Sequence, residues 1–105
     1  YQMHIANSSE AELEAELDID QGADMLIVKP AYADILYRLT NKFPSTPIGV
    51  YHVSGEYAMI KAAVMQGWLD EEQVVLETML GLKRAGARFI ITYYADFIIK
   101  HLSVR

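Results

Sequence analysis

The stretch Gly-Ala-Asp-Met-Leu-Ile-Val-Lys-Pro, residues 22–30, decides the fold. Its four apolar residues at 25–28 follow one another without alternation, which is typical of a parallel strand buried on both faces. A helix is predicted just before it, over residues 9–20, because Ser9 and Glu12 have the spacing of a capping box. Gly22 ends that helix and Pro30 ends the strand. The stretch therefore predicts a helix followed by a buried parallel strand.

The order of a helix followed by a strand repeats to the end of the chain. Further strands are predicted over residues 48–53 and 89–93, and further helices over 31–42, 56–66, 70–86 and 96–102. This order implies parallel strands joined by crossover helices. Three strands cannot close a barrel, and a (β/α)8 barrel needs about 250 residues, whereas the chain has 105. We predict an α/β fold: the C-terminal βα units, about the last three strands, of a (β/α)8 TIM barrel, with residues 1–105 in one catalytic domain without an internal boundary.

Composition excludes several classes of site and partner. The absence of cysteine excludes a disulfide framework or a thiolate metal site within these residues. The net charge of -5 argues against a nucleic-acid-binding surface. No apolar run approaches the length of a membrane span. We expect a soluble, cytoplasmic protein with neither a nucleic-acid nor a membrane partner; a plastid is the alternative for a longer parent protein.

Polar residues stand at the carboxyl ends of the predicted strands. Lys29 ends the first, the second runs into Ser54, and Tyr93 ends the third. Chemistry in barrels and open α/β sheets lies at this edge. The three side chains are therefore predicted to point into one pocket.

Lys29 is the candidate nucleophile. It follows four apolar residues, and desolvation favours the neutral amine over the ammonium. A neutral amine attacks a ketone to give a carbinolamine and then an imine. The alternative is a lysine that extends past the strand end to pair with Asp24 or Asp34.

Ser54 and Tyr93 are candidate ligands of an anion. The hydroxyl of Ser54 and the free amides at the start of a helix can bind one, and the phenol of Tyr93 could bond to the same group. The alternatives are a plain N-cap for Ser54 and an aromatic lid over the barrel core for Tyr93. Together the three residues suggest carbonyl chemistry on a substrate that carries a carboxylate.

Five segments of the sequence resemble the porphobilinogen synthase family, also called 5-aminolevulinate dehydratase. The matching residues are 1–3 with 6–7, 22–30, 53–62, 83–87 and 90–95, of which Val-Ser-Gly-Glu-Tyr-Ala-Met at 53–59 is the most specific. The resemblance implies a lyase that condenses two molecules of 5-aminolevulinate into porphobilinogen, with loss of two waters, in tetrapyrrole and heme biosynthesis.

The resemblance also implies roles for single residues. Lys29 falls on the lysine that forms a Schiff base with one substrate, and Ser54 and Tyr93 fall on residues that hold a substrate carboxylate. Glu14 matches a glutamate that helps to hold an allosteric magnesium in many bacterial members. The family uses zinc or magnesium and no organic cofactor, is commonly octameric, and carries its catalytic metal ligands in a part that precedes this stretch.

Departures from the family pattern leave other interpretations open. Arg88 stands where the family usually has aspartate, His4-Ile5 replaces Asp-Pro, and Leu13 replaces a frequent arginine beside Glu14. One alternative is another Schiff-base barrel, such as a class I aldolase. The other is a non-catalytic remnant that serves as an interaction module. We expect this chain alone to be inactive, because the family's second Schiff-base lysine and active-site lid precede the matching stretch.

Overall fold

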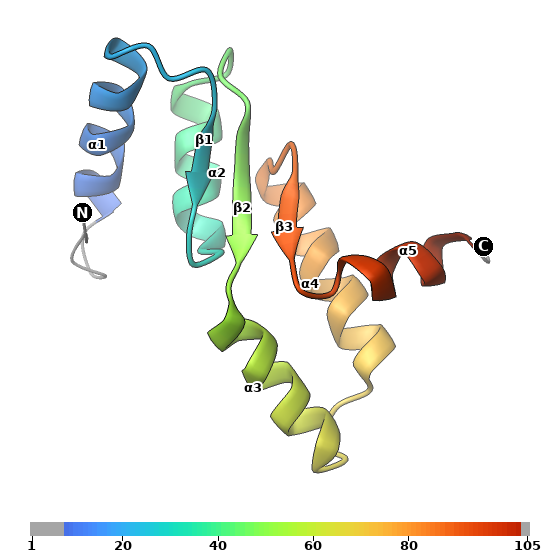
Figure 1. Cartoon of the computed structure of the whole chain (residues 1–105). Coiled ribbons are helices and arrows are strands. Elements are labelled where there is room, and N and C mark those ends of the chain that lie inside the picture. Colours follow the sequence, from blue (N-terminus) through green and yellow to red (C-terminus); the bar gives the residue numbers. More distant parts are fainter. Residues whose placement is uncertain (1–7, 104–105) are drawn as a thin grey trace.

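The computed structural model describes residues 8–103, and its elements alternate as predicted (Figure 1). In chain order they are α1 (Ser8–Asp20), β1 (Leu26–Val28), α2 (Ala33–Lys42), β2 (Ile48–His52), α3 (Ser54–Met65), α4 (Glu71–Ala85), β3 (Ile90–Thr92) and α5 (Ala95–Ser103). Compared with the predictions, α2 begins two residues later and α3 two residues earlier, and all three strands are shorter. The matches at residues 1–3 and 6–7 and the departure at His4-Ile5 lie outside the described residues.

The three strands form one parallel sheet in the order β1-β2-β3. Val28 pairs with Val50, and Val50 pairs in turn with Ile90. The three arrows in Figure 1 accordingly point the same way. Because the strands are parallel and joined through helices, their carboxyl ends meet at one edge of the sheet.

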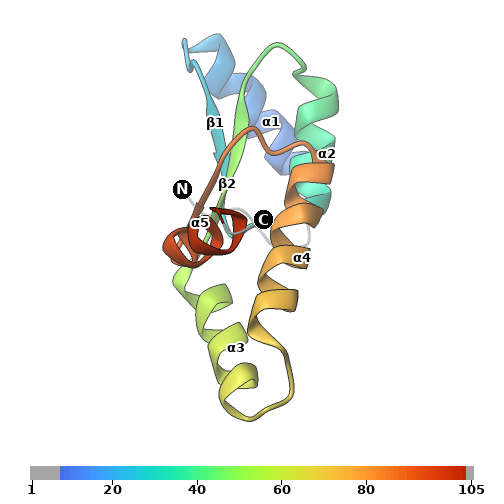
Figure 2. The ribbon, with the colours of Figure 1, turned by 90° about the vertical axis from the view of Figure 1, so that its right-hand side faces the viewer.

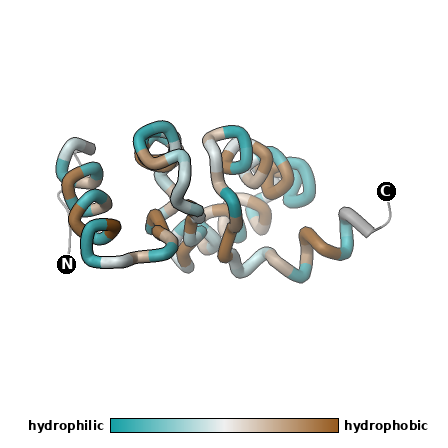
Figure 3. Tube along the Cα trace, turned by 90° about the horizontal axis from the view of Figure 1, so that it is seen from above, coloured by the Kyte–Doolittle hydropathy of each residue, from teal (hydrophilic) through white to brown (hydrophobic). Residues whose placement is uncertain are grey.

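One face of this sheet carries the core. Helices α2 and α4 lie together on that face (Figure 2) and contact each other. The fully buried side chains of the core include Leu36, Ile48, Val50 and Val75. The buried residues of α2 are Ile35, Leu36 and Leu39, which form its apolar face. Figure 3 shows from above that apolar and polar residues alternate along the helices.

The opposite face of the sheet is open. Ile27 is 47% exposed and Ile91 44% exposed, whereas Leu26 and Val28, the neighbours of Ile27, are buried. The prediction that the strand at residues 25–28 is buried on both faces is therefore wrong, whereas β2 is buried at Ile48, Gly49 and Val50 in succession. The physical reason is that, within residues 8–103, α2 and α4 cover only the side to which Leu26 and Val28 point.

Helix α4 has the ends that the sequence predicted. Asp70 caps its start, since Asp70 Oδ1 accepts a 2.9 Å hydrogen bond from Gln73 N. Gly86 ends it in the left-handed conformation with φ of 117°. Thr40 of α2 donates a 3.2 Å hydrogen bond to Ala85 O, so this end of α4 is tied to α2.

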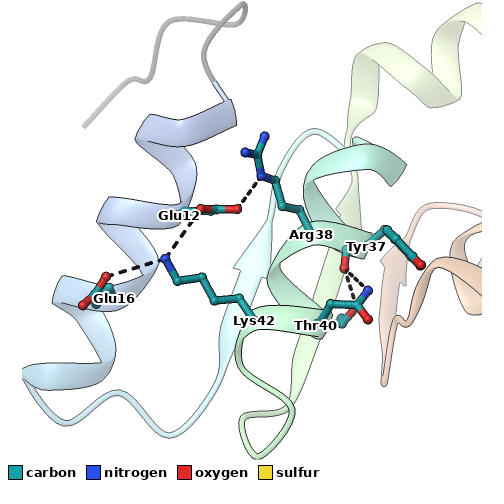
Figure 4. Close-up of polar contacts among 7 residues, drawn as sticks. Glu12, Glu16, Tyr37, Arg38, Thr40 and Lys42 are labelled. Atoms are coloured by element: carbon teal, nitrogen blue, oxygen red, sulfur yellow. Dashed lines mark hydrogen bonds and ion pairs between the residues drawn. The ribbon is translucent and has the colours of Figure 1, made fainter.

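Ion pairs join α1 to α2 at the edge of the molecule (Figure 4). Arg38 bonds to Glu12, and Lys42 Nζ lies 3.5 Å from Glu12 and 3.8 Å from Glu16. The hydrogen bond from Arg38 lowers the pKa of Glu12. Such exposed pairs contribute little to stability. Among the described helices, none combines the length and the apolar character needed to cross a membrane.

Candidate active site

The three candidate residues lie at the same edge of the sheet. Lys29 directly follows β1, Ser54 begins α3 two residues after the end of β2, and Tyr93 directly follows β3. All three are exposed. Helix α3 and the first half of α4 extend beyond this edge (Figures 1 and 2). The structure therefore places the candidates at neighbouring strand ends, as predicted.

Lys29 lies on the open face of the sheet. Side chains alternate along a strand, so Lys29 lies on the same face as Ile27. By the register of the sheet, Lys29 is level with Tyr51 of β2, which pairs with Ile91 of β3. Lys29 and Tyr51 thus lie side by side on the open face, with the apolar Ile91 beyond Tyr51.

Tyr93 is held by two other tyrosines. A hydrogen bond with Tyr93 raises the pKa of Tyr51. The ring centroid of Tyr93 lies 5.5 Å from that of Tyr57 on α3. Sequence analysis did not single out Tyr51 or Tyr57; alternation along β2 could have placed Tyr51 on the face of Lys29.

The expected desolvation of Lys29 is not met in this chain, because its side chain is exposed. The alternative also fails: the ion pairs found in residues 8–103 involve Glu12, Glu16, Glu71 and Glu72, and none includes Asp24 or Asp34. Both results follow from the open face, which leaves the Lys29 nitrogen accessible to water. A dry environment for this amine requires groups outside the described residues.

Ser54 is the first residue of α3 and not its N-cap. The cap position is Val53, which makes no side-chain cap hydrogen bond. The interpretation of Ser54 as a plain N-cap is therefore wrong. Its hydroxyl stays beside the free amides of the first turn, where a helix attracts an anion.

Glu56 is a residue that sequence analysis missed. Its Oε2 accepts a 2.9 Å hydrogen bond from Val53 N, the glutamate half of a capping box. The same carboxylate accepts from Ala31 N, at 3.2 Å to Oε1 and 3.3 Å to Oε2. Neither bond could be predicted, because valine at the cap position does not match the capping-box pattern and Ala31 is 25 residues away.

A buried polar pair lies behind the same edge, on the helical side. His52 is only 3% exposed, and its Nδ1 lies 3.3 Å from Thr92 Oγ1. Burial lowers the pKa of His52, while the charge of Glu56 acts in the opposite direction. Thr92 Oγ1 also accepts from Tyr94 N at 3.1 Å. The ends of β2 and β3 are thus joined by side chains where the ladder stops.

A second cluster joins α3, α4 and the residue after Tyr93. Glu71 Oε2 lies 2.6 Å from Lys61 Nζ and accepts a 3.0 Å hydrogen bond from the Tyr94 hydroxyl. Lys61 lowers the pKa of Glu71, and burial, with Glu71 beside it, raises the pKa of Tyr94 far above its usual value. Tyr94 is 2% exposed, so this cluster fixes the backbone next to Tyr93.

One cavity lies near the candidate residues without including them. A cavity of about 860 Å³ opens on the helical side, lined by Ala31, His52, Glu56 and residues of α4. Lys29, Ser54 and Tyr93 are not part of its lining. That the three share a pocket therefore stays a prediction.

Glu14 lies on α1 and is partly exposed. Within residues 8–103, no group of three or more histidine, aspartate or glutamate side chains is placed to hold a metal ion. The described residues around Glu14 therefore do not fit a metal site by themselves.

Comparison with known proteins identifies the family. The family model described as delta-aminolevulinic acid dehydratase matches residues 1–101. A delta-aminolevulinic acid dehydratase of Synechocystis sp. is 53% identical over 97 residues, which cover 90% of this chain and 29% of the relative. That of Halalkalibacterium halodurans is 50% identical over 105 residues, covering 98% of this chain and 32% of the relative.

A solved structure extends this similarity to the fold. The delta-aminolevulinic acid dehydratase (porphobilinogen synthase) of Toxoplasma gondii ME49, in complex with the reaction product porphobilinogen, superposes with a TM-score of 0.92 at 50% identity. The match covers 96% of this chain and 29% of that one. The chain thus spans about three-tenths of the length of these proteins. Since the family model matches almost every residue, the chain belongs to the delta-aminolevulinic acid dehydratase family.

Proposed function

We propose that this chain is the C-terminal part of a (β/α)8-barrel porphobilinogen synthase, which condenses two molecules of 5-aminolevulinate into porphobilinogen. The family match supports this activity over that of a class I aldolase. The parallel sheet with one open face supports the barrel, because the interior of a barrel is filled by side chains from all its strands. The parent protein would supply those strands and, as the resemblance implies, assemble as a homo-oligomer.

Lys29 would carry the covalent step. Its neutral amine attacks the keto carbon of 5-aminolevulinate, a carbon–nitrogen bond forms, and the carbonyl oxygen becomes the hydroxyl of a carbinolamine. Loss of that hydroxyl as water leaves the imine. The exposed position of Lys29 on the open face agrees with a site that the rest of the barrel closes. Enclosure would then remove the water that keeps the amine protonated.

Ser54 and Tyr93 would hold the carboxylate of the same substrate. The hydroxyl of Ser54 and the amides of the first turn of α3 are donors at the end of β2. The phenol of Tyr93 is a donor at the end of β3, and its contacts with Tyr51 and Tyr57 limit its rotation. Binding the carboxylate at these positions would place the keto group toward β1 and Lys29.

Metal chemistry is not assigned to these residues. Glu14 would contribute to the magnesium site that the resemblance implies only together with ligands from outside the described residues.

The observation that carries the proposal is the placement of Lys29, Ser54 and Tyr93 at three adjacent parallel strand ends in a member of this family. Steady-state kinetics of the full-length parent test it. Lys29→Arg should lower porphobilinogen formation at least about a thousandfold, because a guanidinium cannot form the imine. Ser54→Ala and Tyr93→Phe should mainly raise KM. Lys83→Arg, an exposed lysine in the last turn of α4, is the matched control and should retain activity. Activity of the Lys29→Arg variant within tenfold of the wild type would contradict the proposal.

A further inference from the structure

The carboxylate of Glu56 lies between the loop after β1 and the start of α3. Its Oε2 accepts from Val53 N at 2.9 Å, and its two oxygens accept from Ala31 N at 3.2 and 3.3 Å. Ala31 is 25 residues from Glu56 in the sequence. One side chain therefore joins two segments that come from different strands.

Both segments adjoin candidate site residues. Val53 directly precedes Ser54, and Ala31 is two residues after Lys29. Pro30 has no N–H group, so the amide of Ala31 is the first backbone donor after Lys29. Glu56 thus binds the nearest available donor on each side of the site.

The sheet itself does not hold these segments together. The ladder between β1 and β2 ends with the pair Val28 and Val50, one residue before Lys29. Strand β2 continues to His52, but there it pairs with β3. Beyond the last ladder pair, Glu56 provides the hydrogen bonds between the end of β1 and the end of β2.

The bonding pattern favours a carboxylate. The two amides approach both oxygens, and a carboxylate accepts at both. Glutamine has one carbonyl oxygen, and its NH2 group would face an amide donor. Aspartate keeps the charge but is one methylene shorter, so it can retain the bond to Val53 N and lose the bond to Ala31 N.

We propose that Glu56 is a positioning residue that sets the spacing between Lys29 and Ser54. This role rests on the proposed function. A substrate whose carboxylate is bound at Ser54 presents its keto group at a fixed distance, so the Lys29 amine must be held at that distance to attack it. Misplacement of a reacting group by about 1 Å can cost about a hundredfold in rate.

The test measures the rate of imine formation in the full-length parent. The protein is mixed with 5-aminolevulinate, reduced with borohydride after set times, and the labelled fraction at Lys29 is measured by mass spectrometry. Glu56→Gln and Glu56→Asp should lower the labelling rate at saturating substrate about 10- to 100-fold. The substrate concentration for half-maximal rate should change much less, since Ser54 and Tyr93 remain.

Asp70→Ala provides the matched control. Asp70 also caps a helix through a carboxylate, at 2.9 Å from Gln73 N, but its cap bond stays within one segment. Asp70→Ala should lower the melting temperature about as much as Glu56→Gln does, and should keep the labelling rate at Lys29. Glu56→Asp, which keeps the cap of α3, should lose rate with little loss in melting temperature.

The outcomes separate this proposal from the one on which it rests. Absence of a label at Lys29 in the wild type would overturn both. Wild-type labelling together with an unchanged rate in Glu56→Asp and Glu56→Gln would overturn the role of Glu56 alone. Equal rate losses in the Glu56 variants and in Asp70→Ala would also overturn it, because the effect would then follow stability and not position.

Discussion

The hydroxyl of Tyr94 donates a 3.0 Å hydrogen bond to Glu71, and the same carboxylate oxygen lies 2.6 Å from Lys61. The three residues come from α4, α3 and the turn between β3 and α5. This contact attaches both helices that flank the strand ends to the residue beside Tyr93. Tyr94 itself is almost fully buried, at 2% exposed.

Removing the Tyr94 hydroxyl should destabilise the fold. Tyr94→Phe loses a hydrogen bond to a charged acceptor, and we expect the free energy of unfolding to fall by about 1–3 kcal/mol. Tyr37→Phe is the control, because Tyr37 is 60% exposed and its change should stay within about 0.5 kcal/mol. Urea denaturation of the full-length parent measures both. Equal stabilities of the two variants would show that the hydrogen bond is not stabilising.

The Lys61–Glu71 pair should make stability depend on pH. Lys61 lowers the pKa of Glu71, so the pair stabilises the fold above the ordinary pKa of glutamate and ceases to do so as the pH falls through the lowered value. Glu71 likewise raises the pKa of Lys61, so the contribution is also lost as the pH rises above the ordinary lysine value. Glu71→Gln should therefore reduce the loss of stability between about pH 5 and pH 3. The free energy of unfolding is measured against pH for both proteins. An equal loss of stability on acidification in the wild type and in Glu71→Gln would contradict this prediction.

Gly86 should tolerate alanine less well than Gly22 does. Both have positive φ, at 117° and 98°, so alanine is strained at either position. At Gly86 an added Cβ would also lie 2.6 Å from Thr40 Oγ1, whereas nothing lies within 4 Å at Gly22. We expect Gly22→Ala to cost about 1–2 kcal/mol and Gly86→Ala to cost more. Thermal unfolding of the two variants provides the comparison, and equal costs would show that α2 moves away from α4 without penalty.

The open face of the sheet should make the isolated chain associate. Ile27 and Ile91 are about half exposed there, and exposed apolar sheet surface favours contact between molecules. Ile27→Lys should reduce association, whereas Leu80→Lys, a similarly exposed position on α4, should not. Sedimentation velocity at several concentrations measures this. A compact monomer at all concentrations in the wild type would contradict the prediction.

The sequence predicted those features of the fold that depend on local signals. The spacing of Asp70 and Gln73 and the position of Gly86 predicted both ends of α4, and the apolar run at residues 25–28 predicted β1. The exposure of Lys29 was not predicted, because burial at a strand end depends on what covers the sheet. The bond from Ala31 to Glu56 was also missed, since a contact across 25 residues depends on how the segments pack. The placement of Ser54 and Tyr93 at neighbouring strand ends needed only the parallel order of the strands.

The most direct test of the central claim is the location of the reduced imine. The full-length parent is incubated with 5-aminolevulinate, treated with borohydride, digested and mapped by tandem mass spectrometry. We expect Lys29 to carry the mass of 5-aminolevulinate less one water plus two hydrogens. An active enzyme that is labelled on other lysines while Lys29 stays unmodified would contradict it.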